Sequence, residues 1–366
     1  MRVVGLMSGT SLDGVDAAWI ETDGERIGAF GPSITVPYDD ELREILRQLL
    51  DRAPDLDPAD PLLKEAEQGV TEYHARAVAS IGGPAQLIGF HGQTILHDPA
   101  RGRTWQIGDP VLLARLTRVA VAYDFRSADV AAGGQGAPLA PVYHAAMARE
   151  LKKPVAVLNI GGVANVTWIG EGRLVALDTG PGNGPLDDWV EQRIGRRFDW
   201  NGLLARDGMV DDSLLGRLMA HPYFARPAPK SLDRLEFSQT IAESGLNSLS
   251  AADGAATLVA FTAASVAAAR LPAAPRQWLV CGGGRRNPVM MEALRQRLGV
   301  EVAPVEEVGW NGDGLEAQCF GFLAARVTAG LPLSFPETTG VPRPMPGGRI
   351  VHPPGVDGVP VIRKRE

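Results

Sequence analysis

The sequence predicts an α/β protein made of two domains, each built on a mixed sheet. Strand-like and helix-like segments alternate along the chain, which is the pattern of α/β folds. Predicted hairpins at 3–21 and 155–178 add antiparallel strands and therefore favour mixed sheets over purely parallel ones. Each hairpin opens with an apolar strand that runs into a glycine-containing turn, and 366 residues suffice for two such domains.

Short apolar runs bounded by turn residues predict the strands. The run at 3–7 ends in a Ser-Gly-Thr-Ser turn, and the run at 155–160 ends in two glycines. Each is followed by a further apolar run within about ten residues, as a hairpin requires. Strands are expected at 3–7, 17–21, 87–90, 119–123, 155–160, 165–169, 174–178 and 278–280.

Helices are predicted where apolar residues recur with the period of a helix. In 40–51, leucines and an isoleucine recur on one face. Pro138 stands at the start of the segment 138–150, where helices favour proline. Helices are expected at 40–51, 61–81, 110–117, 138–150, 186–194, 251–270, 288–298 and 314–329.

The glycine-rich segment 131–136 interrupts the alternation and marks the expected domain boundary. Domain I is expected to comprise 1–130 with about 331–366, and domain II to comprise 131–330. The tail from Leu331 is rich in proline and glycine and is expected to wrap the surface, with a short strand near 348–352. The repeated opening suggests that the two domains face each other across a cleft.

Composition excludes several classes of protein. Apolar residues make up 45% and charged residues 22%, and a net charge of −7 leaves no basic footprint for nucleic acid. The uncharged stretch 254–269 is too short to span a bilayer, and no secretory signal is recognised, so a cytoplasmic protein is expected. Cys281 and Cys319 lack metal-ligand spacing and are expected to be buried, reduced thiols.

The first turn whose residues are suited to ligand binding or catalysis is Gly5-Leu-Met-Ser-Gly-Thr-Ser-Leu-Asp-Gly-Val-Asp16. It gathers backbone N–H groups, hydroxyl groups and a carboxylate between two strands. Such a turn holds phosphate oxygens and a metal-bound water. A plain hairpin turn explains the same residues, so the turn gains weight from a second one downstream.

The second turn is Asp178-Thr-Gly-Pro-Gly-Asn183, which lies between a strand and the helix predicted from 186. Its glycines allow an anion to approach the backbone near a helix N-terminus. Asp178 comes directly off a buried strand, where a carboxylate is costly unless it is used or paired. A tight turn with Asp178 as a local cap is the alternative.

The third turn is Cys281-Gly-Gly-Gly284, which follows a strand and leads to a helix. Consecutive glycines let a flat ligand such as a nucleobase lie against the backbone. A plain strand–helix turn explains this segment equally well.

The order of these three turns resembles the sugar kinase/Hsp70/actin superfamily, whose two ribonuclease H-like domains hold ATP in a central cleft. More specifically, the first turn resembles the signature of the anhydro-N-acetylmuramic acid kinases. Further matching segments are His91-Gly-Gln-Thr94, Gln106-Ile-Gly108, Asp124-Phe-Arg-Ser-Ala-Asp129, Gly133-Gly-Gln-Gly-Ala-Pro-Leu139, Asn159-Ile-Gly-Gly162, Asp178-Thr-Gly-Pro-Gly-Asn183, Cys281-Gly-Gly-Gly284 and Glu316-Ala317. The chain departs from the family at Lys230-Ser-Leu-Asp-Arg-Leu-Glu236, where the family usually has Lys-Ser-Thr-Gly-Arg-Glu.

The resemblance implies a kinase of peptidoglycan recycling that uses ATP, Mg²⁺ and water. Its substrate is 1,6-anhydro-N-acetylmuramic acid, and its products are N-acetylmuramic acid 6-phosphate and ADP. Asp13 is expected to reach Mg²⁺ through water, and a homodimer is a family-based expectation. The residues expected to bind ATP are Gly9, Thr10, Ser11, Leu12, Asp13, Gly14, Val15, Asp16, Gly161, Gly162, Gly180, Gly282 and Gly283. Asp16 is also explained as an outward-facing polar residue of a strand.

Asp178 is the predicted base that deprotonates the attacking water, and Arg126 is predicted to contact the lactyl carboxylate or the transferring phosphoryl group. An ion pair with Asp124 is the alternative explanation of Arg126. The residues expected to bind the sugar are His91, Gln93, Gln106, Asp109 and Glu316. A structural histidine is the alternative for His91.

Two other functions stay open at this level. A kinase of the same family that acts on levoglucosan (1,6-anhydroglucose) would need no groups for a lactyl ether or an acetamide. A nucleotide-gated, non-enzymatic protein of the actin type would belong to another class, but it would not need the carboxylates Asp13 and Asp178.

Overall fold

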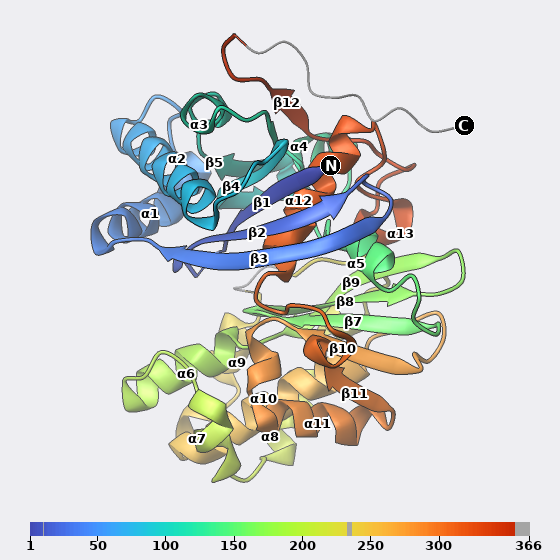
Figure 1. Ribbon diagram of the computed structural model, residues 1–366. Coiled ribbons are helices and arrows are strands. Elements are labelled where there is room, and N and C mark those ends of the chain that lie inside the picture. Colours follow the sequence, from blue (N-terminus) through green and yellow to red (C-terminus); the bar gives the residue numbers. More distant parts are fainter. Residues whose placement is uncertain (10, 233–235, 356–366) are drawn as a thin grey trace. The chain divides into compact units, whose positions relative to one another are not determined.

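The computed structural model describes residues 1–9, 11–232 and 236–355 and divides into two compact units (Figure 1). Unit 1 comprises Met1–Met147 and Asp313–Glu366, and unit 2 comprises Ala148–Gly312. The segments 131–147 and 313–330, which the sequence assigned to domain II, lie in unit 1. The physical reason is that the helix α12 (Leu315–Thr328) packs on the central strands of the unit 1 sheet.

Unit 1 is built on a seven-stranded mixed sheet with the order β12-β6-β4-β1-β2-β3, and β5 pairs with β4. β1 is antiparallel to β2 and parallel to β4, so a hairpin and a crossover meet at one strand. The strands are β1 (Arg2–Ser8), β2 (Gly14–Thr22), β3 (Ile27–Pro37), β4 (Leu87–Asp98), β5 (Arg103–Ile107), β6 (Val121–Tyr123) and β12 (Arg349–Val351).

The two faces of this sheet are covered by different helices. α1 (Asp40–Arg52), α2 (Pro61–Ile81) and α3 (Pro110–Thr117) share one apolar core with the sheet. On the other face, α12 lies so close that a Cβ on Gly89 would collide with the backbone oxygen of Phe320. Short helices complete the unit: α4 (Ser127–Ala131), α5 (Pro141–Met147) and α13 (Pro336–Thr339).

Unit 2 is built on a five-stranded mixed sheet with the order β11-β10-β7-β8-β9. β10 runs parallel to both β7 and β11, whereas β7, β8 and β9 form an antiparallel meander. The strands are β7 (Val155–Ile160), β8 (Val163–Ile169), β9 (Leu174–Pro181), β10 (Gln277–Cys281) and β11 (Glu301–Pro304).

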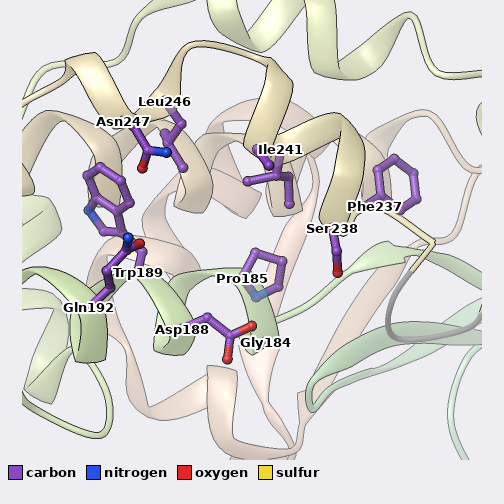
Figure 2. Close-up of a pocket in the computed structure, with 11 residues that line it drawn as sticks. Gly184, Pro185, Asp188, Trp189, Gln192, Phe237, Ser238, Ile241, Leu246 and Asn247 are labelled. Atoms are coloured by element: carbon purple, nitrogen blue, oxygen red, sulfur yellow. The ribbon is translucent and has the colours of Figure 1, made fainter.

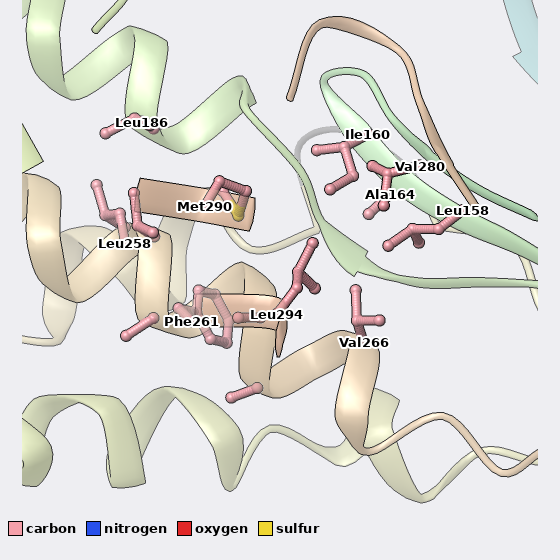
Figure 3. Close-up of a cluster of buried hydrophobic side chains, with 14 of the residues drawn as sticks. Leu158, Ile160, Ala164, Leu186, Leu258, Phe261, Val266, Val280, Met290 and Leu294 are labelled. Atoms are coloured by element: carbon pink, nitrogen blue, oxygen red, sulfur yellow. The ribbon is translucent and has the colours of Figure 1, made fainter. Parts of the chain in front are cut away.

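The core of unit 2 forms between this sheet and its helices (Figure 3). α10 (Ala251–Ala267) is buried along most of its length, and Phe261 and Val266 on it belong to the same cluster as Leu158 of β7. The other helices are α6 (Gly184–Ile194), α7 (Leu203–Arg206), α8 (Asp212–Met219), α9 (Ser238–Glu243) and α11 (Pro288–Leu298).

The α/β class with mixed sheets is confirmed, and so are the eight predicted strands. Cys281 and Cys319 are free and buried, as expected. The sequence missed β3, because its glycines and Pro32 are unusual in a strand interior and are tolerated here at the sheet edge. It also missed β5, β11 and the short helices between 200 and 248. In the described part of the chain, no helix combines the length and the apolar character needed to cross a membrane.

The contact between Gly89 and α12 gives a stability prediction. Gly89→Ala should lower the free energy of unfolding by about 1–3 kcal/mol, because the added methyl group meets backbone that cannot move aside. The matched control is Gly216→Ala at an exposed position in the middle of α8. The added methyl group meets open space there and should raise the free energy of unfolding by about 0.5–1 kcal/mol. Urea unfolding measures both, and equal effects would contradict the close-packing account.

Candidate functional site

The first turn connects β1 to β2 through residues 9–13. Leu12 takes a left-handed conformation with φ 58° and is buried, and its N–H donates to the carbonyl oxygen of Gly9 at 3.3 Å. The Asp13 carbonyl oxygen accepts from the N–H of Tyr38 at 3.1 Å. Ser11 and Asp13 are exposed, so the turn presents a hydroxyl and a carboxylate outward. Thr10 lies outside the described residues.

A buried hydrogen-bond network fixes the base of this turn. The Ser8 hydroxyl donates to Gln93 Oε1 at 2.5 Å, and the Tyr38 hydroxyl donates to Ser8 Oγ at 2.8 Å. Gln93 Nε2 donates to the carbonyl oxygens of Gly9 and Thr94, each at 3.2 Å. Gln93 is fully buried, so the structure gives it a role in supporting the turn, which differs from the sugar contact expected from the sequence.

Negative charge gathers at the far end of the turn. Thr35 Oγ1 donates to Asp16 Oδ1 at 2.6 Å across the β2–β3 pair. The pKa of Asp16 is nevertheless raised, mainly by burial and further by the nearby carboxylates Asp313 and Asp13. Carboxylates gathered in this way, with Asp16 resisting ionisation, are electrostatically suited to a cation.

His91 and Arg126 form a second feature of unit 1. Arg126 Nε and Nη2 both lie within hydrogen-bond distance of His91 Nε2, at 3.1 and 3.0 Å, and Nη1 donates to the Gly136 carbonyl oxygen at 2.7 Å. His91 Nδ1 lies 2.8 Å from the Gly92 carbonyl oxygen, so Nδ1 donates and Nε2 accepts. Burial, and then the charge of Arg126, hold the pKa of His91 well below its usual value, so this imidazole is neutral.

Arg126 has no carboxylate partner within ion-pair distance among the residues that the structure describes. Asp124, the partner considered from the sequence, pairs instead with Arg349 at 3.1 Å. The donors of Arg126 go to an imidazole and a carbonyl group, neither of which carries a negative charge. A half-buried cation in this state is an anion-binding group.

The other residues expected to bind the sugar lie in different settings. Gln106 on β5 donates to the hydroxyl oxygens of Thr104 and Thr94 at 2.9 and 3.2 Å. Asp109 is exposed, and its carboxylate caps α3 by accepting from two backbone N–H groups. Glu316 is exposed in the first turn of α12, near enough to affect Arg126 electrostatically.

The three glycine turns of unit 2 come together at one edge of its sheet. β7 and β10 are parallel neighbours, with Asn159 paired to Cys281, so the turns after them start side by side. The carbonyl oxygens of Gly161 and Gly162 accept from backbone N–H groups of 182–184 at 2.7–3.1 Å. The second and third turns therefore lie against the turn after β7.

Glycine is required at several of these positions for different reasons. A Cβ on Gly282, where φ is 75°, would collide with Asn159, whereas Gly162 is exposed and faces open space. Gly180 is buried, and a Cβ there would meet Ser265 of α10, so the structure makes it a packing glycine. The turn leads into α6, whose first N–H groups favour an anion.

Asp178 is the first residue of the second turn and still belongs to β9, and its surroundings raise its pKa. Leu232 N–H donates to Asp178 Oδ2 at 2.7 Å, and the Tyr223 hydroxyl donates to the Asp178 carbonyl oxygen at 2.6 Å. Burial raises the pKa of Asp178 to about 7, although the Leu232 hydrogen bond and the charge of Lys230 act in the opposite direction. A carboxylate with this pKa is suited to general-base catalysis near neutral pH. Local capping does not explain this carboxylate, because the backbone N–H that donates to it belongs to Leu232, 54 residues further along the chain.

A pocket of about 270 Å³ adjoins the start of α6 (Figure 2). Its walls come from α6 on one side and from α9 with the segment 246–247 on the other. Trp189 and Phe237 give it aromatic surface. It is lined by Gly184, Pro185, Asp188, Trp189, Gln192, Phe237, Ser238, Ile241, Ala242, Leu246 and Asn247. The glycines expected to flank adenosine, Gly282 and Gly283, are not among these residues.

Glycine turns at strand ends, a helix N-terminus and a carboxylate with a raised pKa are features typical of α/β proteins that bind phosphate groups. Comparison with known proteins gives the family. The family model for anhydro-N-acetylmuramic acid kinase matches residues 1–353. The chain therefore belongs to the anhydro-N-acetylmuramic acid kinase family, and it is a phosphotransferase.

Curated relatives agree with this family over nearly the whole chain. An anhydro-N-acetylmuramic acid kinase of Acidiphilium cryptum is 63% identical over 354 residues, which cover 96% of this chain and 99% of the relative. The anhydro-N-acetylmuramic acid kinase of Rhodospirillum rubrum is 55% identical over 353 residues, which cover 94% of this chain and 92% of the relative. Among solved structures, a ROK family glucokinase from Streptomyces griseus in complex with glucose and AMPPNP matches with a TM-score of 0.42 and 14% identity, over 89% of this chain and all of that one.

The buried network around Gln93 gives a prediction for the kinase reaction. Gln93→Leu should raise the KM for the phosphoryl donor about tenfold, because Ser8 and Gly9 lose their buried partner. The KM for the acceptor should change less than threefold, roughly, since the turn rather than the acceptor site is disturbed. Gln86→Leu removes an exposed hydrogen bond at the start of β4 and is the control. Initial-rate kinetics would contradict this role if the acceptor KM alone rose.

Proposed function

We propose that this chain uses ATP and water to open 1,6-anhydro-N-acetylmuramic acid and to phosphorylate its O6. The products are N-acetylmuramic acid 6-phosphate and ADP. Relatives named for this substrate, similar over nearly their whole length, support the kinase activity. The structural observation that carries the mechanism is the half-buried Asp178 carboxylate, whose pKa is raised to about 7.

The proposed reaction couples hydrolysis of the anhydro bridge to phosphoryl transfer. Water attacks C1 and gives its proton to Asp178, while the bond between C1 and the bridge oxygen breaks. The bridge oxygen, now O6, takes the γ-phosphoryl group, and the bond from that group to ADP breaks. Phosphoryl transfer thus replaces the general acid of an ordinary glycosidase.

Asp178 acts as the base only when it is ionised. A pKa of about 7 makes it ionised in half of the molecules at neutral pH and a stronger base than an ordinary aspartate. One general base typically supplies about 10²–10⁴-fold of rate, so positioning and charge neutralisation supply the remainder.

The turns are proposed to bind ATP through their backbone. In unit 1, residues 9–16 would hold the β- and γ-phosphates, because the turn presents Ser11 and Asp13 outward. In unit 2, Gly161 and Gly162 would contact phosphate, and Gly162 is exposed, with open space where a Cβ would stand. Gly282 and Gly283 would flank the adenosine. Gly180 would act through packing.

The residues of unit 1 fit Mg²⁺ held through water. Asp13 is exposed, and the charges of Asp13 and Asp313 act on Asp16, whose pKa is raised mainly by burial. Among the described residues, no three ligating side chains are close enough to form a metal cage. Mg²⁺ suits such a place, because it keeps several of its waters and binds with phosphate oxygens. When bound, it would neutralise charge on the phosphates.

Arg126 favours the muramic sugar over levoglucosan. Its guanidinium has neutral partners alone within the described ranges, and His91 orients it by accepting from Nε and Nη2. We propose that it contacts the lactyl carboxylate or the transferring phosphoryl group. A contact with the lactyl carboxylate is absent in levoglucosan, which has no such group. Gln106 and Glu316 are proposed as further sugar contacts.

The first test concerns Asp178. Asp178→Asn should lower kcat about 10²–10⁴-fold, because the amide cannot accept the proton of water. For the unaltered enzyme, kcat/KM should rise with pH and level off above about 7, since the carboxylate must be ionised. ADP release with 1,6-anhydro-N-acetylmuramic acid measures both.

The control for this test is Asp188→Asn, a carboxylate on α6 that the proposal does not use. It should keep the rate and the pH profile. Full activity of Asp178→Asn would contradict the assignment of the base, while leaving the kinase reaction itself in place.

The second test separates the two substrates through Arg126. Arg126→Met should lower kcat/KM for 1,6-anhydro-N-acetylmuramic acid by about 10²-fold, if a charge-assisted contact to the lactyl carboxylate is lost. The slower turnover of levoglucosan should fall by less than about threefold. Equal losses for both sugars would instead assign Arg126 to the transferring phosphoryl group. No loss for either sugar would contradict both roles.

A further inference from the structure

We propose that Tyr223 and Lys230 are positioning residues that hold Asp178 in place and adjust its basicity. This inference rests on the proposed role of Asp178 as the base. It concerns a segment, 222–232, that lies more than 40 residues after Asp178 in the chain and departs from the family pattern at Leu232.

Asp178 is held by this segment at three points. Its N–H donates to the Lys230 carbonyl oxygen at 2.9 Å, and its carbonyl oxygen accepts from the Tyr223 hydroxyl at 2.6 Å. Its carboxylate accepts from the Leu232 N–H at 2.7 Å. Lys230 and Leu232 contribute only backbone atoms to these hydrogen bonds. The hydrogen bond to Asp178 therefore does not depend on the side chain at position 232, where this chain has leucine in place of the residue usual in the family.

Lys230 brings a positive charge to this place. Its Nζ donates to the Tyr223 carbonyl oxygen at 3.0 Å and lies 4.2 Å from the centre of the Tyr223 ring. Lys230 is half-buried and, within the described residues, forms no ion pair. Among the described residues, the charge is thus held by a ring and a carbonyl group and not by a carboxylate in direct contact.

Tyr223 is a rigid support for both residues. It is fully buried, and its ring packs against Phe224 and Phe237, with centroids 5.8 Å away in each case. One tyrosine therefore ties the Asp178 backbone to the Lys230 ammonium group. A shift of the tyrosine would move the base and its neighbouring charge together.

Other charged groups lie around this cluster. Arg226 stands over the Tyr223 ring at 5.3 Å, but it is paired with Glu236 at 2.6 Å. Arg226, Arg270, Asp178 and Glu236 all act on Lys230, and burial lowers the pKa of Lys230. On Asp178 itself, Lys230 is the cation that opposes the effect of burial.

The test is the pH profile of kcat/KM for ADP release in full-length variants. Lys230→Met should move the acidic limb upward by about 0.5–1 pH unit, because a cation that favours the ionised carboxylate is lost. Lys230→Arg should keep the limb in place. Tyr223→Phe should lower kcat about fivefold at every pH without moving the limb, because it removes a neutral hydrogen bond and keeps the ring.

Arg226→Met is the matched control, because it removes from the same Tyr223 ring a cation that is already paired with Glu236. The acidic limb of its pH profile should coincide with that of the unaltered enzyme. An unmoved limb in Lys230→Met, in protein that melts at the unaltered temperature, would overturn the inference. So would an equal shift in Arg226→Met. Failure of the proposed base is distinguishable, because Asp178→Asn would then keep its activity in the otherwise unaltered enzyme. Failure of the proposed reaction is distinguishable as well, because the unaltered enzyme would then release no ADP with the muramic sugar.

Discussion

The partial burial of one carboxylate, Asp178, is the constraint on which the proposed chemistry of this protein depends. Burial favours the protonated form, so the folded protein binds a proton at Asp178 more readily than the unfolded chain does. Its contribution to stability is therefore fully present below the unfolded pKa, near 3.8, and is lost as pH rises through about 7. Tyr223, Lys230 and Leu232 hold the group in spite of this cost. A carboxylate that is retained where its ionised form destabilises the fold is typical of a functional residue.

Glycines let backbone segments pack in direct contact in both units. In unit 1, Gly89 lets α12 lie directly on the sheet, and this contact places the first residues of that helix within unit 1. In unit 2, Gly282 lets the turn after β10 pack on the turn after β7. The same residue type serves two purposes, because a glycine that admits a neighbouring backbone differs from one, such as Gly162, that faces open space. Only the open kind is suited to contact a phosphate directly.

Local patterns made much of the fold and of the site predictable. Strand–turn signals are short-range, so the three glycine turns and Asp178 were found from the sequence alone. The edge strand 27–37 was not, because its glycines and proline obscure the alternation. Long-range contacts were also beyond reach. Nothing in the sequence shows that Gln93 supports a turn 84 residues away, or that Tyr223 reaches back to Asp178. The departure at Leu232 drew attention to its segment, but its contact is made by the backbone and so leaves no side-chain signal.

The most direct test of the central claim is the titration of Asp178 itself. Carbon-13 NMR of labelled aspartate carboxyl groups, in the unaltered protein and in Asp178→Asn, identifies the Asp178 resonance as the one lost in the variant. The account predicts that this resonance titrates with a midpoint near pH 7, far above the ordinary value of 3.8. A midpoint close to the ordinary value would contradict the account, because an aspartate of ordinary basicity would have no need of this buried setting.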